Sequence, residues 1–299
     1  MKFDVITFGG AVVDVFAGTD LAERGKFIAY PVGSKILIKD LRFDIGGGAT
    51  NTATAFSRLG LRTGCICKVG DDERGRNILE LLRKERIKFL GKIEKGKKSG
   101  YSIILDSKEK GRTVLTYRGV NNNISFNDLK LKKLKTKWIY FASALGQSLQ
   151  TQMRLAKILK ARGVKIAYNP GEYVIRKANI KPLLRLADIL ILNKEEAGLL
   201  TKQKNLLSGL HKLTGGVVVI TDKNKLINCF DGQKKYTLMP NKIKVVERTG
   251  AGDAFASGFV AGQVAGKSIP NSLRLGLRES ESVIKYFGAK NNLLKLKIK

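Results

Sequence analysis

The sequence predicts an α/β fold with a mostly parallel central sheet and a small β-sheet lid. Strand-like runs alternate with helical stretches along nearly the whole chain, and this pattern favours parallel strands covered by helices. Two regions break the alternation. Tyr101–Leu105 and Arg112–Tyr117 flank a Lys/Glu/Gly turn and predict a hairpin, while residues 16–43 show short apolar runs without a helical period. We therefore expect lid segments at about 16–43 and 99–119.

The individual elements follow from local patterns of apolar residues. Short runs rich in β-branched and aromatic residues predict strands at Val5–Phe8, Gly64–Val69, Trp138–Ala142, Lys165–Tyr168, Ile189–Leu192 and Gly216–Thr221. Helical periodicity predicts helices at Ala49–Leu59, Gly75–Glu85 and Gln150–Arg162. Near the C-terminus an apolar stripe at helical spacing is formed by Leu273, Leu277, Ile284 and Phe287.

Length and composition favour a single domain over residues 1–299. Hydrophobic residues make up 43% of the 299, enough for a substantial core, and no internal repeat or low-complexity linker divides the chain. No apolar run approaches the ~18–20 residues that span a bilayer. The chain enters a probable strand at Phe3–Phe8 without a basic-then-apolar leader. We expect a soluble, cytoplasmic protein without a membrane partner.

The net charge is strongly positive, +31, from 56 Lys+Arg against 25 Asp+Glu. Such a field attracts anions, including nucleic acids and anionic metabolites. The basic residues are dispersed and aromatic residues do not interleave with them, as they do in single-strand stacking surfaces. We interpret the charge as solvated lysines and expect no specific nucleic-acid partner. Any such binding would be salt-labile.

The three cysteines are interpreted as core residues. Cys65 and Cys67 are two positions apart and share one face of a strand. A metal site would need further Cys or His ligands at suitable spacing, which Cys229 and the single His211 do not supply.

The stretch from Val245 to Phe259 has the strongest chemical character. A β-branched pair passes into a small-residue turn, and from Asp253 onward the chain has the pattern of a helix. Gly250 and Gly252 leave the backbone uncovered where the helix begins, and the first N–H groups of a helix attract anions. Asp253 lies in this first turn, where an exposed carboxylate beside an anion site is useful only if it performs chemistry.

A second glycine-rich string, Asp44–Gly60, lies upstream. Its glycines allow close approach of a ligand to the backbone, and Asn51 offers both a donor and an acceptor. Together the two strings resemble the two signatures of the ribokinase-like (PfkB) carbohydrate kinases, and the resemblance covers nearly the whole chain. It implies a three-layer sandwich and ATP-dependent phosphoryl transfer to a hydroxyl of a sugar or sugar-containing small molecule.

The resemblance also implies roles for residues that match the family pattern. Asp253 would be the general base, with the N–H groups of Gly250, Ala251 and Gly252 binding the phosphoryl group. Acceptor contacts would come from Asp14, Gly46, Gly47, Asn51 and Asn121, and nucleotide contacts from Thr249, Asn193 and Thr221. Mg²⁺ would be supported by Glu196 and Asn193.

Two departures from the family pattern change the expectations. Glu247-Arg248 replaces the usual Asp-Thr, which argues against the monovalent-cation site that many members build there. Residues 221–225 lack the glycines common in the nucleotide loop, which leaves the adenine end of the site least defined.

Alternative functions and a partner remain open. A nucleoside kinase of the same family would share the sugar contacts, and a non-catalytic sugar- or nucleic-acid-binding protein would use the scaffold alone. The hairpin at 101–117 leaves strand edges and an apolar face uncovered, so we also predict a homodimer through the lid.

Overall fold

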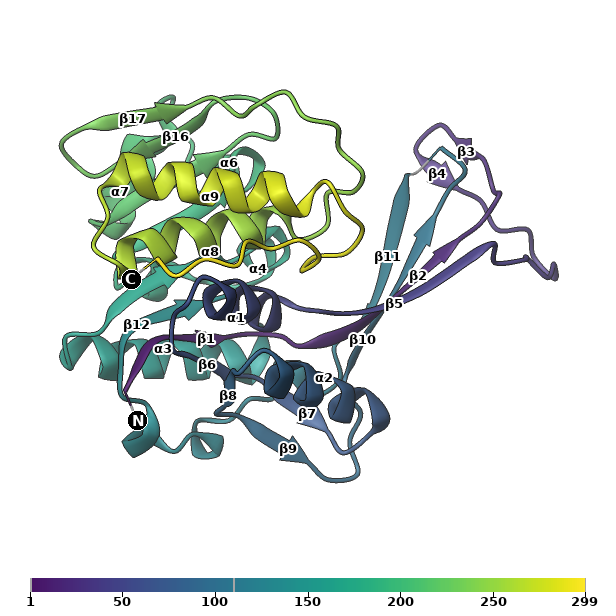
Figure 1. The fold of residues 1–299 in the computed structure, drawn as a ribbon, viewed down its shortest axis with the longest axis horizontal. Helices are drawn as coiled ribbons and strands as arrows, with labels where there is room; N and C mark the ends of the chain where they lie inside the picture. The colour runs from purple at the N-terminus through teal and green to yellow at the C-terminus, as the bar shows by residue number, and fades with distance from the viewer. Residues whose placement is uncertain (1, 110, 299) are drawn as a thin grey trace.

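The computed structural model describes residues 2–109 and 111–298, and its middle layer is a nine-stranded sheet (Figure 1). The strands are β1 (Phe3–Phe8), β6 (Thr63–Ile66), β8 (Lys88–Phe89), β12 (Thr136–Phe141), β13 (Lys165–Tyr168), β14 (Ile189–Asn193), β15 (Val217–Thr221), β16 (Ile227–Phe230) and β17 (Lys235–Leu238). Their order is β17-β16-β15-β14-β13-β12-β1-β6-β8. All neighbours from β8 to β15 are parallel, and β16 and β17 form an antiparallel edge. The prediction of a mostly parallel sheet is confirmed.

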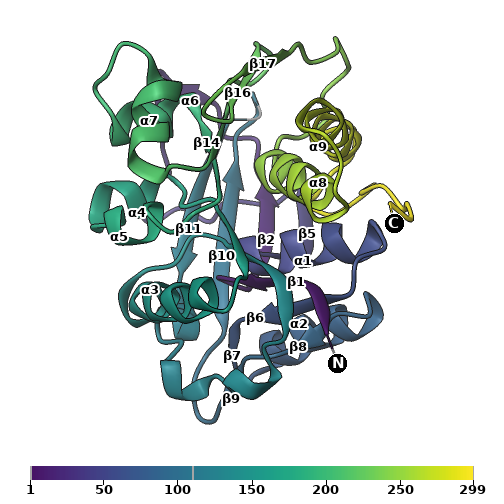
Figure 2. The same ribbon diagram turned by 90° about the vertical axis from the view of Figure 1, so that its left-hand side faces the viewer.

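Helices cover both faces of this sheet (Figure 2). One face carries α1 (Gly48–Arg58), α2 (Glu73–Lys84), α8 (Ala251–Val264) and α9 (Ile269–Val283). The other carries α3 (Gly146–Ala161), α4 (Glu172–Lys177), α5 (Lys181–Leu184), α6 (Lys194–Leu200) and α7 (Leu206–Thr214). Phe56, Tyr140 and Phe259 are fully buried beneath the first layer, and Leu155 and Leu210 beneath the second. Short 3₁₀ turns lie at Gly119–Asn122, Phe126–Asp128 and Leu131–Lys133.

A separate four-stranded sheet projects from one end of the body (Figure 1). It consists of β2 (Val12–Gly18), β5 (Asp40–Gly46), β10 (Gly100–Asp106) and β11 (Arg112–Tyr117), in the order β11-β10-β2-β5. The short pair β3 (Glu23–Arg24) and β4 (Phe27–Ile28) lies at its far end, whereas β7 (Lys68–Gly70) pairs with β9 (Lys92–Glu94) on the body. This sheet is the expected lid, so the predicted fold class is confirmed.

The two faces of the lid sheet differ in character because side chains alternate along each strand. The register places Val15 beside Phe43 on one side and beside Ile103 on the other, with Leu115 beyond, so one face is apolar across all four strands. The opposite face aligns Asp44, Asp14, Ser102 and Thr116 in one row. The polar row belongs to the end of the lid that meets the body.

Three elements differ from their predicted form. The single strand expected at Gly64–Val69 divides into β6 and β7, because Lys68–Gly70 turns away to pair with β9. The C-terminal helix ends at Val283, before two residues of the predicted stripe: Ile284 is its C-cap, and Phe287 packs against Phe16 of the lid at 4.6 Å between ring centroids. The edge strands β16 and β17 carry no apolar run long enough to have been predicted.

The cysteines and the absence of long apolar helices complete the fold. Cys65, Cys67 and Cys229 are free thiols, each 0% exposed, which confirms their interpretation as core residues. Within residues 2–109 and 111–298, no helix has both the length and the apolar character that crossing a membrane requires.

Candidate active site

The N-terminus of α8 begins at a glycine that no other residue type could replace without strain. Gly250 is the N-cap and has φ +78°, and a Cβ there would lie 2.6 Å from Ala289. A Cβ at Gly252 would meet nothing within 4 Å, so this side of the turn is open to a ligand. The N–H group of Ala251 donates to the carbonyl of Arg248 at 3.2 Å. In this respect the structure differs from the prediction, because the turn itself uses one of the three proposed anion-binding donors.

Asp253 occupies the third position of α8 and faces α1. Its Oδ2 accepts a hydrogen bond from Nδ2 of Asn51 at 2.8 Å, so the two signature strings meet across 202 residues of sequence. Asp253 is half-buried and not exposed, contrary to the expectation for a first-turn residue. Burial raises its pKa, and the Asn51 hydrogen bond and the charge of Lys290 oppose that rise.

Lys290 is a member of this cluster that the sequence patterns missed. Its side chain is buried, with Nζ 3.3 Å from Oδ1 of Asn51 and 3.4 Å from Oδ1 of Asp44. It follows Gly288 and Ala289 in the loop after α9. In the sequence it is one of several lysines near the C-terminus, and it differs from them in following Gly-Ala directly. In the structure this Gly-Ala loop packs against Gly250.

The polar face of the lid contributes carboxylates to the cluster. Asp14 and Asp44 lie opposite each other on β2 and β5, and burial raises the pKa of Asp14 against the effects of Ser102 and Lys290. Gly46 must lack a side chain, because a Cβ there would lie 1.9 Å from Oδ2 of Asp14. Gly47 has φ +99°, and its Cβ would lie 2.4 Å from the carbonyl oxygen of Gly10.

The amide of Asn121 is hydrogen-bonded to the backbone of the loop after β1. Its Oδ1 accepts from the N–H of Ala11 and its Nδ2 donates to the carbonyl of Ala11, both at 2.9 Å. The side chain is 3% exposed. Both ends of the amide therefore hold the loop after β1, and the contact of Asn121 with an acceptor stays a prediction.

The residues predicted to serve nucleotide and metal lie at the carboxyl ends of adjacent strands. Asn193 ends β14 directly beside Thr221, which ends β15. Asn193 and Glu196 form a reciprocal capping box at the start of α6, with hydrogen bonds of 2.8 and 2.9 Å. Glu196 is 8% exposed, and burial raises its pKa.

This donor set suits Mg²⁺. A buried carboxylate beside an amide oxygen provides hard oxygen ligands, and Mg²⁺ is commonly bound by one or two carboxylates together with waters and phosphates. The described residues contain no group of three or more His, Cys, Asp or Glu that could hold a metal by themselves. The protein alone would therefore supply only part of the coordination of Mg²⁺.

The residues where the family pattern would place a monovalent cation are differently occupied. Arg112 of the lid forms an ion pair with Glu247 and a hydrogen bond with Thr249. Glu247 also accepts from the N–H groups of Thr249 at 2.9 Å and Gly288 at 3.1 Å. Although burial acts to raise it, these hydrogen bonds hold the pKa of Glu247 below its usual value. The carboxylate already has a cationic partner, so the residues present do not fit a monovalent cation.

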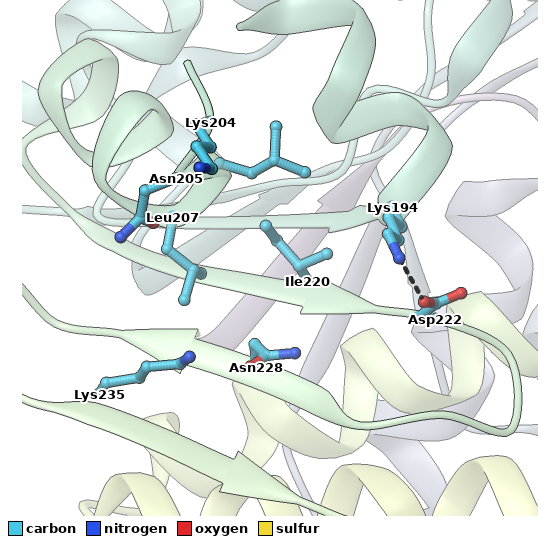
Figure 3. A pocket seen from close by; sticks show the side chains of 9 residues that line it. Lys194, Lys204, Asn205, Leu207, Ile220, Asp222, Asn228 and Lys235 are labelled. Carbon is cyan, nitrogen blue, oxygen red and sulfur yellow. Dashed lines mark hydrogen bonds and ion pairs between the residues drawn. The ribbon is translucent and has the colours of Figure 1, made fainter. Parts of the chain in front are cut away.

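A cavity of about 480 Å³ opens beside the carboxyl ends of β14 and β15, on the α7 side of the sheet (Figure 3). Lys194, Lys204 and Lys235 stand around a floor that includes Leu207 and Ile220, and Lys194 pairs with Asp222 at 3.1 Å. None of the residues around Asp253 line it. The cavity therefore lies apart from the carboxylate cluster.

Comparison with known proteins is consistent with this arrangement. The family model described as pfkB family carbohydrate kinase matches residues 11–296. An uncharacterized sugar kinase of Archaeoglobus fulgidus is 28% identical over 246 residues, 79% of this chain and 97% of the relative. A ribokinase of Lactococcus lactis subsp. lactis is 27% identical over 268 residues, 88% of this chain and 87% of the relative.

A solved structure shows the same fold at lower identity. The adenosine kinase of Sinorhizobium meliloti superposes with a TM-score of 0.85, at 24% identity, over 97% of this chain and 96% of that one. The match of the family model over nearly the whole chain agrees with the meeting of both signature strings at Asp253. The chain therefore belongs to the pfkB family of carbohydrate kinases and is a phosphotransferase that acts on an alcohol group.

Proposed function

We propose that this chain transfers the γ-phosphoryl group of ATP to a hydroxyl of a sugar or a sugar-containing small molecule. The observation that carries the proposal is the position of Asp253. Its carboxylate lies at the open N-terminus of α8 and is hydrogen-bonded to Asn51, which Lys290 connects to the lid carboxylate Asp44. A carboxylate that can accept a proton, a helix N-terminus that can bind an anion and a polar surface for the phosphoryl acceptor therefore adjoin one another.

In this proposal each part meets one need of phosphoryl transfer, which depends mainly on positioning and charge stabilisation. Asp14 and Asp44 accept hydrogen bonds from acceptor hydroxyls. Asp253 takes the proton of the attacking hydroxyl, and the N–H groups of Gly250 and Gly252 bind the phosphoryl oxygens. Thr249 and Thr221 lie on the nucleotide side. Asn193 and Glu196 would support Mg²⁺, which neutralises phosphate charge when bound.

The lid completes the arrangement by covering the acceptor. The pair of Arg112 with Glu247 joins β11 to the loop before α8 across 135 residues. Closing the lid over the acceptor excludes water that would otherwise hydrolyse ATP. We propose that the adenine-binding residues lie beyond Thr221, because in this proposal the phosphates would lie between α8 and the ends of β14 and β15.

The substitution Asp253→Asn tests the proposal. The amide keeps the shape of the side chain and its hydrogen-bonding capacity but removes the proton acceptor. Turnover should fall by ~10²–10⁴-fold, which corresponds to roughly 2.7–5.5 kcal/mol of barrier. ATP affinity should be kept or slightly increased, because a negative charge leaves the phosphate site. Thermal stability should be kept, because a half-buried charge is removed.

The assay measures ADP release across pentoses, hexoses, sugar phosphates and nucleosides, with ATP titration and thermal melting alongside. Glu73→Gln is the matched control, since Glu73 is an exposed first-turn carboxylate on α2. A folded Asn variant that keeps more than about a tenth of wild-type turnover removes Asp253 as the base. Release driven by nucleosides alone favours the nucleoside kinase, and no release with any acceptor favours the non-catalytic alternative.

We also propose that the apolar face of the lid binds a second copy of this chain. Phe43 and Leu41 on β5 are 67% and 51% exposed, and Leu115 and Tyr117 on β11 are 54% and 56% exposed. They share one continuous face of the sheet with Val15. Because β5 and β11 are the two edges of this sheet, a second lid would cover the apolar face and the free edges together.

Sedimentation at micromolar concentration, with and without acceptor, measures this association. The double substitution Phe43→Glu and Leu115→Glu should convert a dimer to a monomer by placing two charges in the covered face. Val32→Glu is the control, because Val32 is fully exposed outside the sheet. A wild-type protein that sediments as a monomer under both conditions refutes the dimer.

A further inference from the structure

Lys290 is buried at the centre of the carboxylate cluster, and the assigned machinery does not use it. Its side chain comes from the loop after α9 and is 4% exposed. Burying an ammonium is costly unless it is paired, yet its nearest carboxylate, on Asp44, is 3.4 Å away. Its other polar contact among the described side chains is Oδ1 of Asn51, at 3.3 Å. A lysine in this position calls for an explanation other than a tight ion pair.

The hydrogen bonds give Lys290 a directional effect on Asn51. An ammonium can only donate, so the Asn51 atom facing Lys290 is the carbonyl oxygen Oδ1. An ionised carboxylate can only accept, so the Asn51 atom facing Asp253 is the amide nitrogen Nδ2. Lys290 and Asp253 thereby require the same orientation of the Asn51 amide. The reversed orientation would bring Oδ1 against the carboxylate and Nδ2 against the ammonium.

This orientation has a consequence for the base itself. Asn51 engages Oδ2 of Asp253, so the other oxygen, Oδ1, lies outside that hydrogen bond and could accept from an acceptor hydroxyl. If Asn51 were free to rotate, the carboxylate could turn with it. Small displacements of a positioned reacting group reduce rates strongly.

The charges around Lys290 give it an electrostatic effect as well. Asp44 from β5, Asp14 from β2 and Asp253 from α8 are carboxylates near its ammonium, and Arg58 from α1 is a second cation. Burial lowers the pKa of Lys290, while the charge and hydrogen bond of Asp44 act to raise it. Lys290 opposes the burial-driven rise in pKa of both Asp14 and Asp253. It therefore favours the ionised, proton-accepting form of Asp253.

We propose that Lys290 is a positioning residue for phosphoryl transfer, which holds Asn51 in the orientation that aims Asp253 at the acceptor hydroxyl and supplies a positive charge to the carboxylate cluster. The inference rests on the proposed function, because Asp253 is taken as the base. It adds a residue that no signature string contains.

The test is the pH dependence of kcat/KM for Lys290→Met, which preserves chain length and removes the charge. Without the ammonium, the acidic limb of the profile, where Asp253 becomes protonated, should move to higher pH by about one unit. At neutral pH kcat should fall by about 10–100-fold, and the loss should shrink as the pH is raised. The affinity for ATP, measured by titration, should stay within about twofold.

Two further variants keep the test decisive. Lys290→Met leaves the partly buried Asp44 without its cation, so the double variant Lys290→Met with Asp44→Asn removes both charges and protects the fold. The displaced acidic limb should persist in the double variant. Lys68→Met is the matched control, because it removes an equally buried lysine outside the cluster and should leave the limb in place.

The outcomes separate this inference from the proposed function. An acidic limb that is unmoved in the folded double variant, or that moves equally in Lys68→Met, overturns the role of Lys290 while leaving Asp253 as the base. A folded Asp253→Asn protein with wild-type turnover overturns the proposed function instead. A displaced limb with retained ATP affinity supports the inference, since a purely structural lysine would lower stability without moving the profile.

Discussion

Two buried lysines have different ionic partners: Lys68 lies where β7 pairs with β9, and Lys290 lies in the candidate active site. Lys68 and Lys290 are 5% and 4% exposed, so both ammonium groups have lost most of their water. Lys68 lies 2.6 Å from Glu94 and 3.1 Å from Asp128, and donates to the carbonyl of Asn123 at 2.8 Å. Lys290 has instead one carboxylate at 3.4 Å and one amide oxygen at 3.3 Å.

The direction of each pKa follows from these contacts. Burial acts to lower the pKa of both lysines, but hydrogen bonds to Glu94 and Asp128 overcome it at Lys68 and raise that pKa. At Lys290 burial prevails and the pKa is lowered, despite Asp44. The partners of Lys68 thus favour its charged form. Lys290 has longer contacts and lies among groups that the proposed chemistry would use.

The distances from the two lysines to their carboxylate partners indicate which buried charges serve function. A charge whose partners are all near and opposite serves the fold, and removing it should cost stability alone. A charge at longer distance from several carboxylates tunes their protonation and orientation, and removing it should alter chemistry more than stability. The two lysines give a direct test, because their exposure is the same.

The largest effect on stability is expected at the structural lysine. Lys68→Met leaves Glu94 and Asp128 without their buried cation, and breaking a buried pair in this way costs about 3–5 kcal/mol of unfolding free energy. Denaturant unfolding measures this loss, and kcat of the folded protein should be unchanged. A Lys68→Met protein with wild-type stability would show that the ion pairs of Lys68 do not stabilise the fold.

The same carboxylate supplies the control for that variant. Lys92 lies 3.1 Å from Asp128, as Lys68 does, but its side chain is 54% exposed. An exposed pair contributes only about 0–1 kcal/mol. Lys92→Met should therefore cost far less than Lys68→Met, and equal losses would show that burial does not decide the contribution of an ion pair here.

Much of the site could be predicted from sequence because its backbone demands are local. Gly250 with φ +78° and Gly46 beneath Asp14 require glycine for reasons of conformation and space, and both lie in the signature strings. Asp253 is recognised from its place directly after that turn. These residues lie in short motifs, so the family resemblance is contained in the local sequence.

The rest of the site depends on contacts that no local pattern contains. The burial of Lys290 beside Asp44 is a contact between positions 246 residues apart in the chain. The hydrogen bonds of the Asn121 amide with the backbone of Ala11 join positions 110 residues apart. Likewise Phe287 left the predicted helical stripe because it packs against Phe16 of the lid. Long-range packing decides each of these cases.

A third buried ionisable group, the carboxyl of Glu279, should have a smaller effect on stability than Lys68. Glu279 on α9 is 0% exposed and accepts from the N–H of Leu294 at 2.9 Å, and burial raises its pKa from 4.5 to about 7. Below about pH 4.5 the carboxyl is protonated in both the folded and unfolded chains. As the pH rises, the unfolded chain releases its proton first, so the folded state loses stability until about pH 7, by up to about 3 kcal/mol.

Glu279→Gln should remove this loss, because an amide does not ionise and its oxygen can still accept from Leu294. Relative to wild type, the variant should therefore gain unfolding free energy between pH 5 and pH 8, measured by denaturant unfolding at both pH values. Each protein serves as its own control, because a change in packing would alter the unfolding free energy equally at pH 5 and pH 8. A difference between the two proteins that is the same at pH 5 and pH 8 would show that Glu279 ionises normally. Burial opposed by the charges of Arg58 and Arg278 would then not suffice to raise the pKa of a carboxylate in this fold, and the different pKa shifts of Lys68 and Lys290 would have to be explained by their partners alone.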